Sequence, residues 1–164
     1  MPRLEDTYHW ALIVGPKKES ENSHGKRFHA KESLGLVGSP PTVHPVWQYE
    51  ELDIGMAPTS MLLVRVVVGR VKSMSRLRSA FESVPVRGHV ENWNCVEWVK
   101  EALLCAIQDG GALGASVKHW EPVRDAAMWY VKAKTTAHRF DGTGHYDLAK
   151  VPTWDMLDGV ELVP

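Results

Sequence analysis

The stretch NCVEWVKEALLCAIQD, residues 94–109, carries the strongest helical pattern of the chain. Its apolar residues recur every three or four positions, which places one set of them on a single face of a helix: Val96, Val99, Leu103, Ala106 and Ile107. The Gly110-Gly111 pair predicts the end of the helix, because glycine is the usual residue just past a helix C-terminus. We therefore expect a helix that packs firmly against the fold while its first turn borders a cleft.

The start of this helix has the residues of an N-terminal cap. Asn94 is a favoured N-cap residue, and Glu97 three positions later predicts a capping box. This register makes Cys95 the first helical residue, where free N–H groups and the helix dipole favour a thiolate and lower the pKa of the thiol. A free cysteine is more often a small buried apolar residue. Cys95 therefore indicates a nucleophile only if a base lies beside it.

Strand patterns fill the first half of the chain and helical patterns the second. We predict strands at 8–15, 26–30, 46–52 and 61–71, with an exposed connection at 16–25 and a loop at 34–45. Helices are predicted at 73–84, 94–109 and 121–139, followed by a tail that contains one helical turn capped by Thr153. Strands that precede the helices favour an α+β fold over alternating βαβ units.

The chain has the organisation of one domain over residues 1–164, since no internal repeat or long linker divides it. Within this domain the histidine-bearing strands occupy 8–72, the helical half with the cysteine helix occupies 73–139, and the tail occupies 140–164.

Two of the eight histidines differ from the others. His9 and His29 lie inside apolar strand patterns, whereas the other histidines fall in polar loops, at helix ends or in the tail. A buried imidazole without a partner costs free energy, so two of them on neighbouring strands predict a mutual hydrogen bond or a site. Histidine is also the usual proton acceptor for a cysteine nucleophile near neutral pH.

Three short motifs resemble the circularly permuted papain-like superfamily: "HWALIVG" at 9–15, "RFHA" at 27–30 and "NCVEWVKEAL" at 94–103. The pattern is similar to that of the lecithin–retinol acyltransferase-like and phospholipase/acyltransferase proteins, and to the PPPDE-type deubiquitinating and deSUMOylating peptidases. The histidines precede the cysteine, as the permutation requires. The resemblance covers residues 8–108 in outline and implies an antiparallel sheet packed against helices, including the cysteine helix. The segments "HRFDG" (138–142) and "KVPTWD" (150–155) also resemble small uncharacterised fungal proteins.

The resemblance implies roles for individual residues. Cys95 matches the nucleophile, His9 the general base and His29 the polar residue that orients the base. Asn94 and Trp10 are implied as residues for orientation or for binding the oxyanion. The implied activity is that of a cysteine hydrolase or acyltransferase, which acts on an amide, ester or thioester through a thioester intermediate. No cofactor is implied.

Other functions compete with this one. The same fold could form a catalytically silent binding or scaffold domain, since fold does not secure activity. A lipid acyltransferase or phospholipase is a further alternative, although the final residues, VPTWDMLDGVELVP, lack the hydrophobic anchor of the membrane-active relatives. Cys95, His9 and His29 could instead bind zinc, but a fourth ligand is missing from the pattern, so we expect no metal.

Composition limits the partners. Nineteen basic and 20 acidic residues give a net charge of -1, which argues against a nucleic-acid-binding face. Arg65 and Arg70 interrupt the most apolar run, so no transmembrane segment is expected. Two cysteines ten positions apart on one helix cannot pair, and the first residues lack the pattern of a signal peptide. We expect a cytoplasmic protein with a small-molecule, peptide or protein acyl substrate, in an oligomeric state that the sequence leaves open.

Overall fold

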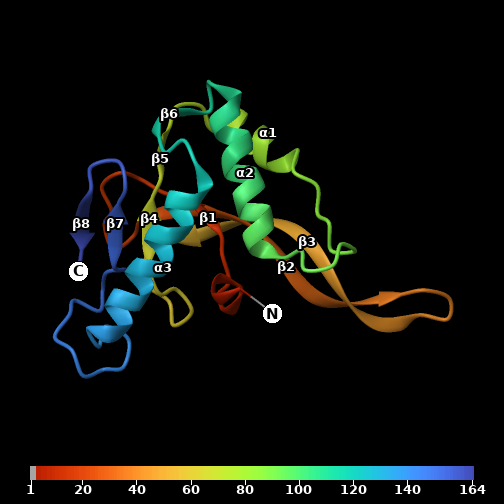
Figure 1. Cartoon of the computed structure of the whole chain (residues 1–164), viewed down its shortest axis with the longest axis horizontal. Coiled ribbons are helices and arrows are strands. Elements are labelled where there is room, and N and C mark those ends of the chain that lie inside the picture. The colour runs from red at the N-terminus through yellow and green to blue at the C-terminus, as the bar shows by residue number, and fades with distance from the viewer. Residues whose placement is uncertain (1–2) are drawn as a thin grey trace.

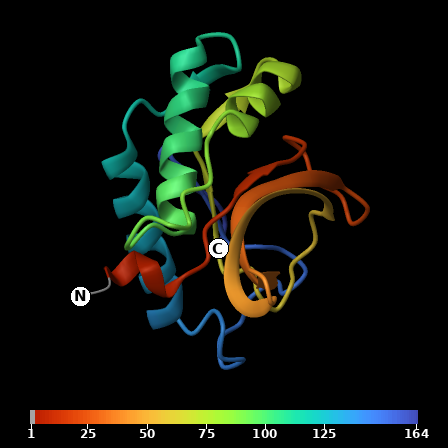
Figure 2. The same ribbon diagram turned by 90° about the vertical axis from the view of Figure 1, so that its right-hand side faces the viewer.

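The computed structural model describes residues 3–164 and has a mixed α+β fold; residues 1 and 2 of the predicted domain lie outside this range. A strongly curved sheet forms one side of the molecule and the helices form the opposite side (Figures 1 and 2). The elements are η1 (Leu4–Thr7), β1 (Leu12–Val14), β2 (His24–Val37), β3 (Thr42–Gly55), β4 (Arg65–Val67), β5 (Gly69–Val71), α1 (Met74–Glu82), α2 (Cys95–Asp109), β6 (Leu113–Ser116), α3 (Trp120–Thr136), β7 (Thr153–Asp155) and β8 (Val160–Val163).

The main sheet is antiparallel, with the strand order β1-β2-β3. Strands β2 and β3 form a long hairpin that extends well beyond the rest of the molecule (Figure 1). The predicted loop at 34–45 is therefore wrong, because most of it belongs to these strands. The turn itself is confined to the residues around Gly38, whose φ of 96° suits glycine. Pro45 is tolerated in β3 because this strand lies at the edge of the sheet, where a missing N–H does least harm.

The predicted strand at 8–15 is also shorter than expected. Only Leu12–Val14 pairs with β2, so His9 and Trp10 lie in an extended segment just before β1. The apolar pattern alone does not show where backbone pairing starts.

The predicted strand at 61–71 is split into two. Strand β4 pairs in parallel with β7 and β5 pairs antiparallel with β6, so the chain changes partners at Val68. The main sheet is antiparallel, as the resemblance implied, whereas the small sheet β4-β7-β8 contains this parallel pair. Gly114 lies in β6.

The helical turn predicted at Thr153 is wrong, because this residue begins β7, which pairs with β4 and β8. Long-range contacts hold this tail in place. The Tyr130 hydroxyl donates to Val163 O at 3.0 Å, and Lys134 forms an ion pair with Glu161. The buried Arg139 guanidinium donates to main-chain oxygens of the tail, among them Lys150 O at 2.8 Å.

The predicted helices are confirmed to within a few residues at their ends. The hydroxyl of Ser73 caps α1 by accepting from Arg76 N, and Gly110 ends α2 with a φ of 73°. These boundaries were predictable because capping depends on residues that are neighbours in the sequence. Within residues 3–164, none of the helices has the length and apolar character needed to cross a bilayer.

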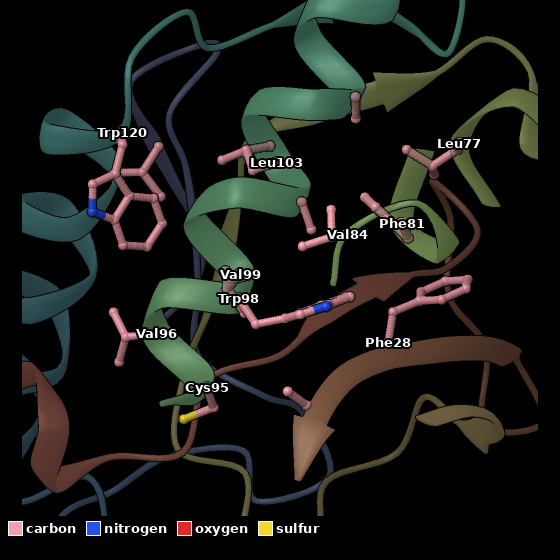
Figure 3. Packing of buried hydrophobic residues seen from close by; sticks show 14 of the residues in the cluster. Phe28, Leu77, Phe81, Val84, Cys95, Val96, Trp98, Val99, Leu103 and Trp120 are labelled. Carbon is pink, nitrogen blue, oxygen red and sulfur yellow. The ribbon is translucent and has the colours of Figure 1, made fainter. Parts of the chain in front are cut away.

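The core lies between the sheet and the helices. Figure 3 shows Trp98 extending from α2 toward Phe28 and Phe81, while Cys95 lies at the first turn of the same helix. The Trp98 ring packs against Phe81 of α1 and Tyr49 of β3, at centroid distances of 6.2 and 5.5 Å. Helix α2 is thus fixed to both the sheet and α1.

We expect substitutions along α2 to differ sharply in their cost to stability. Leu103→Ala should lower the free energy of unfolding by about 2–5 kcal/mol, because it leaves a cavity in the core. Cys95→Ala removes a single buried atom and should cost about 1 kcal/mol. Urea unfolding followed by circular dichroism measures both values. An equal loss in the two variants would show that Cys95 is a structural core residue.

Candidate active site

Cys95 is the first residue of α2, and its position is fixed by Asn94. The Asn94 side-chain oxygen accepts from Val96 N at 2.9 Å, and its amide nitrogen donates to Asp6 Oδ1 at 2.9 Å. The predicted N-cap is therefore confirmed, but the capping box is wrong. Glu97 turns instead to Arg3, whose guanidinium lies 2.7 Å from its carboxylate. A charged partner from another segment outcompetes a backbone N–H for this carboxylate.

The segment that carries His9 runs directly past the sulfur of Cys95. The thiol donates a long hydrogen bond to Tyr8 O at 3.9 Å, and the backbone N–H of Trp10 stabilises the ionised sulfur. In an extended chain, the C=O of one residue and the N–H of the residue two positions later point to the same edge. The C=O of Tyr8 and the N–H of Trp10, on either side of His9, thus both face Cys95. Among the hydrogen bonds of residues 3–164, none joins the side chains of Cys95 and His9 directly.

His9 and His29 are in direct contact, as one of the two sequence-based interpretations required. His9 Nε2 lies 2.7 Å from His29 Nδ1, and the rings meet edge to face with centroids 4.9 Å apart. His29 is buried, at 4 % exposure. His9 was expected to be buried as well, but the residue as a whole is exposed and only part of its ring is shielded from solvent, because the segment before β1 lies at the border of the sheet. The part of the His9 imidazole that faces solvent is accessible to a substrate.

Glu50 belongs to the same cluster and was missed by the sequence analysis. It lies directly opposite His29 in the β2–β3 register, and its Oε1 is 3.0 Å from His29 Nε2. Its other oxygen, Oε2, pairs with Lys31 Nζ at 2.7 Å. The predicted strand at 46–52 contains both Glu50 and Glu51, and only the register shows which one faces His29. Alternation along this strand was the available signal, but it does not fix the pairing.

The side chains of Trp10 and Asn94 are bound to other groups. The Trp10 indole N–H donates to Glu5 O at 3.1 Å, and its ring packs against Trp120 with centroids 5.7 Å apart. Asn94 uses both ends of its amide, as described above. Their side chains therefore hold the His9 segment and the helix start in place, and the backbone of Trp10 faces the sulfur.

Burial reverses the expected ionisation of Cys95. It raises the pKa of the thiol above its ordinary value of 9.0, although the N–H groups of Trp10, Cys95 and Val96 act in the opposite direction. Our expectation of a lowered thiol pKa is thus wrong, because desolvation outweighs the helix start. Burial also lowers the pKa of His9 and of His29 below 6.5, and the neighbouring Arg27 acts in the same direction on both. The resting site therefore holds a neutral thiol and neutral imidazoles at pH 7.

A hollow of about 430 Å³ lies beside the start of α2. Its lining includes Asp6, Trp93 and Glu97, but neither Cys95 nor His9. Among residues 3–164, no group of three or more His, Cys, Asp or Glu side chains is arranged to hold a metal ion. Both cysteines are free.

The model of a family of unknown function, DUF6914, matches residues 1–163. The chain belongs to this family. No curated protein and no solved structure matches it. The family assignment thus covers essentially the whole chain without supplying an activity, and any function has to be inferred from the cluster of Cys95, His9, His29 and Glu50.

The raised pKa of Cys95 can be tested by alkylation. In a Cys105→Ser variant, which leaves a single thiol, the rate of iodoacetamide labelling should rise only above about pH 9, since the thiolate is the reactive form. Mass spectrometry at several pH values measures this rate. A half-maximal rate below pH 8 would indicate a resting thiolate and contradict the burial argument.

The lowered histidine pKa values make stability depend on pH. Between pH 7.5 and 5.5 the unfolded chain takes up protons at His9 and His29 while the folded chain resists them, so the free energy of unfolding should fall as the pH falls below 6.5. Carboxylates change their protonation mainly below about pH 5, so they add little to the change in stability between pH 7.5 and 5.5. Urea unfolding at both pH values measures the change. His29→Asn should make the dependence shallower; a wild-type stability that is flat or rises toward pH 5.5 would refute the assignment.

Proposed function

We propose that the protein is a cysteine hydrolase or acyltransferase with a permuted papain-like fold, in which Cys95 is the nucleophile and His9 the general base. The observation that supports this most is the arrangement around His9: its two flanking backbone groups contact Cys95 and its ring is hydrogen-bonded to the buried His29. A nucleophile, a base and a group that orients the base are the parts that acyl transfer requires.

The ionisation states favour a general-base route over a resting ion pair. The Cys95 thiol is neutral because burial raises its pKa, and His9 is unprotonated because burial lowers its pKa. As the sulfur attacks the acyl carbon, its proton passes to His9, a carbon–sulfur bond forms and the carbonyl electron pair moves to oxygen. When the tetrahedral intermediate collapses, the leaving group departs with the proton from His9 and a thioester remains on Cys95.

The free N–H groups at the start of α2 can stabilise the oxyanion. Val96 N–H is bound to the Asn94 side chain, which leaves the backbone N–H groups of Trp10 and Cys95 as the donors that face the sulfur. The positive end of the helix dipole acts in the same direction. Asn94 contributes by fixing the helix start and Trp10 by fixing the His9 segment.

The substrate in this proposal is an amide, ester or thioester of a small molecule, peptide or protein. Water releases the acyl group in a hydrolase, and another nucleophile accepts it in a transferase. Both cysteines are free, which suits a reducing compartment such as the cytoplasm.

Acylation by p-nitrophenyl acetate tests the proposal. Intact-mass spectrometry of the wild-type protein should show one acetyl group, on Cys95. The Cys95→Ala variant should form no adduct and show no turnover. His9→Ala should slow acylation and turnover by about 10²- to 10⁴-fold, the usual contribution of a general base. His44→Ala, which changes an exposed histidine of the hairpin, and Cys105→Ala serve as matched controls. Absence of an adduct at Cys95, or the same rate in His9→Ala as in wild type, would favour the catalytically silent domain.

A further inference from the structure

The cluster continues beyond the two histidines to a carboxylate that neither sequence nor family assigns a role. Glu50 Oε1 lies 3.0 Å from His29 Nε2, and His29 Nδ1 lies 2.7 Å from His9 Nε2. These contacts form a chain of hydrogen bonds that starts on β3, crosses β2 and ends at the ring of His9, in the segment whose backbone contacts Cys95.

The positions of the protons along this chain follow from chemistry. An ionised carboxylate only accepts hydrogen bonds, so His29 Nε2 must carry a hydrogen and donate it to Glu50. A neutral His29 then has a bare Nδ1, which accepts from His9 Nε2–H. A neutral His9 with its hydrogen on Nε2 has its lone pair at Nδ1, the nitrogen free to take a proton from a thiol.

We propose that Glu50 is a positioning residue that fixes the tautomer of His29 and, through it, the tautomer of His9. Its role in catalysis rests on the proposed function, whereas the tautomers themselves do not. Without the carboxylate, His29 can carry its hydrogen on Nδ1 and donate to His9 Nε2. His9 would then hold its hydrogen on Nδ1 and have no lone pair there for Cys95.

The charges around the cluster are consistent with an ionised Glu50. Lys31 Nζ lies 2.7 Å from its second oxygen, and hydrogen bonds from Lys31 and His29 hold the pKa of Glu50 below its usual range. Arg27 and Lys31 disfavour a protonated His29, while Glu50 favours it, and burial of the ring lowers the net pKa. The neutral state of His29 that the tautomer argument needs is therefore the stable one at pH 7.

Imidazole nitrogen NMR tests the proposal directly, because it distinguishes a protonated ring nitrogen from a bare one. In uniformly ¹⁵N-labelled protein at pH 7.5, both His9 and His29 should carry the hydrogen on Nε2. Glu50→Leu should move both hydrogens to Nδ1 or mix the two forms. Glu50→Gln keeps an oxygen acceptor of the same shape and should retain the wild-type tautomers, as should Lys31→Met. A wild-type spectrum with hydrogen on Nδ1 of either ring, or tautomers unchanged in Glu50→Leu, would overturn the proposal.

The activity of the same variants separates this proposal from the proposed function. Glu50→Leu should slow acylation of Cys95 by p-nitrophenyl acetate at least about tenfold, because a base in the wrong tautomer is inactive. Glu50→Gln should restore most of the rate. If wild-type protein shows the expected tautomers but no acylation, the proposed function fails and the positioning role in the histidine pair stands. If acylation depends on His9 but neither rate nor tautomers respond to Glu50→Leu, the positioning role fails and the proposed function stands. If Glu50→Leu does not fold, the wild-type and Glu50→Gln spectra decide.

Discussion

The burial of Trp98 between the sheet and α1 determines where the site lies. Its ring packs against Tyr49 and Phe81 and is removed from water, which anchors α2 one turn after its start. Cys95 lies on that first turn, so its sulfur is placed by the same packing. The histidines belong to the sheet side of the molecule. The geometry between thiol and imidazole therefore depends on how α2 packs on the sheet and on how the segment before β1 is held against it.

Features that depend on sequence neighbours were predictable. The helix ends, the Asn94 cap and the position of Cys95 at the first helical residue follow from side chains within a few positions of one another. The contact between His9 and His29 was predictable as one of two outcomes, because apolar surroundings force a buried imidazole to find a partner. In each case the decisive interaction joins residues that are close in the sequence, or is required because burying an unpaired polar group costs free energy.

Features that depend on distant partners were not predictable from the pattern. Thr153 begins a strand because its backbone pairs with β4, which lies far earlier in the chain. The choice of Glu50 over Glu51 as the partner of His29 requires the pairing register. The raised pKa of Cys95 reflects how completely the fold covers the sulfur, which the helix-start argument does not contain. Gly and Pro residues at 34–45 suggested a loop, although an edge strand accommodates them.

The pairing of β2 with β3 also makes the His29–Glu50 contact depend on a turn that lies far from it. In a hairpin, the length and type of the turn set the register, and a slip of one residue turns every side chain of a strand to the other face. Such a slip would place Phe28 or Ala30 opposite Glu50, with His29 turned away from it. The turn around Gly38, at the far tip of the hairpin, thus helps to set the register that places His29 opposite Glu50, and with it the proposed tautomers of the two histidines. An insertion or deletion in this remote, exposed turn that shifted the register would alter the chemistry of the site without touching any of its residues.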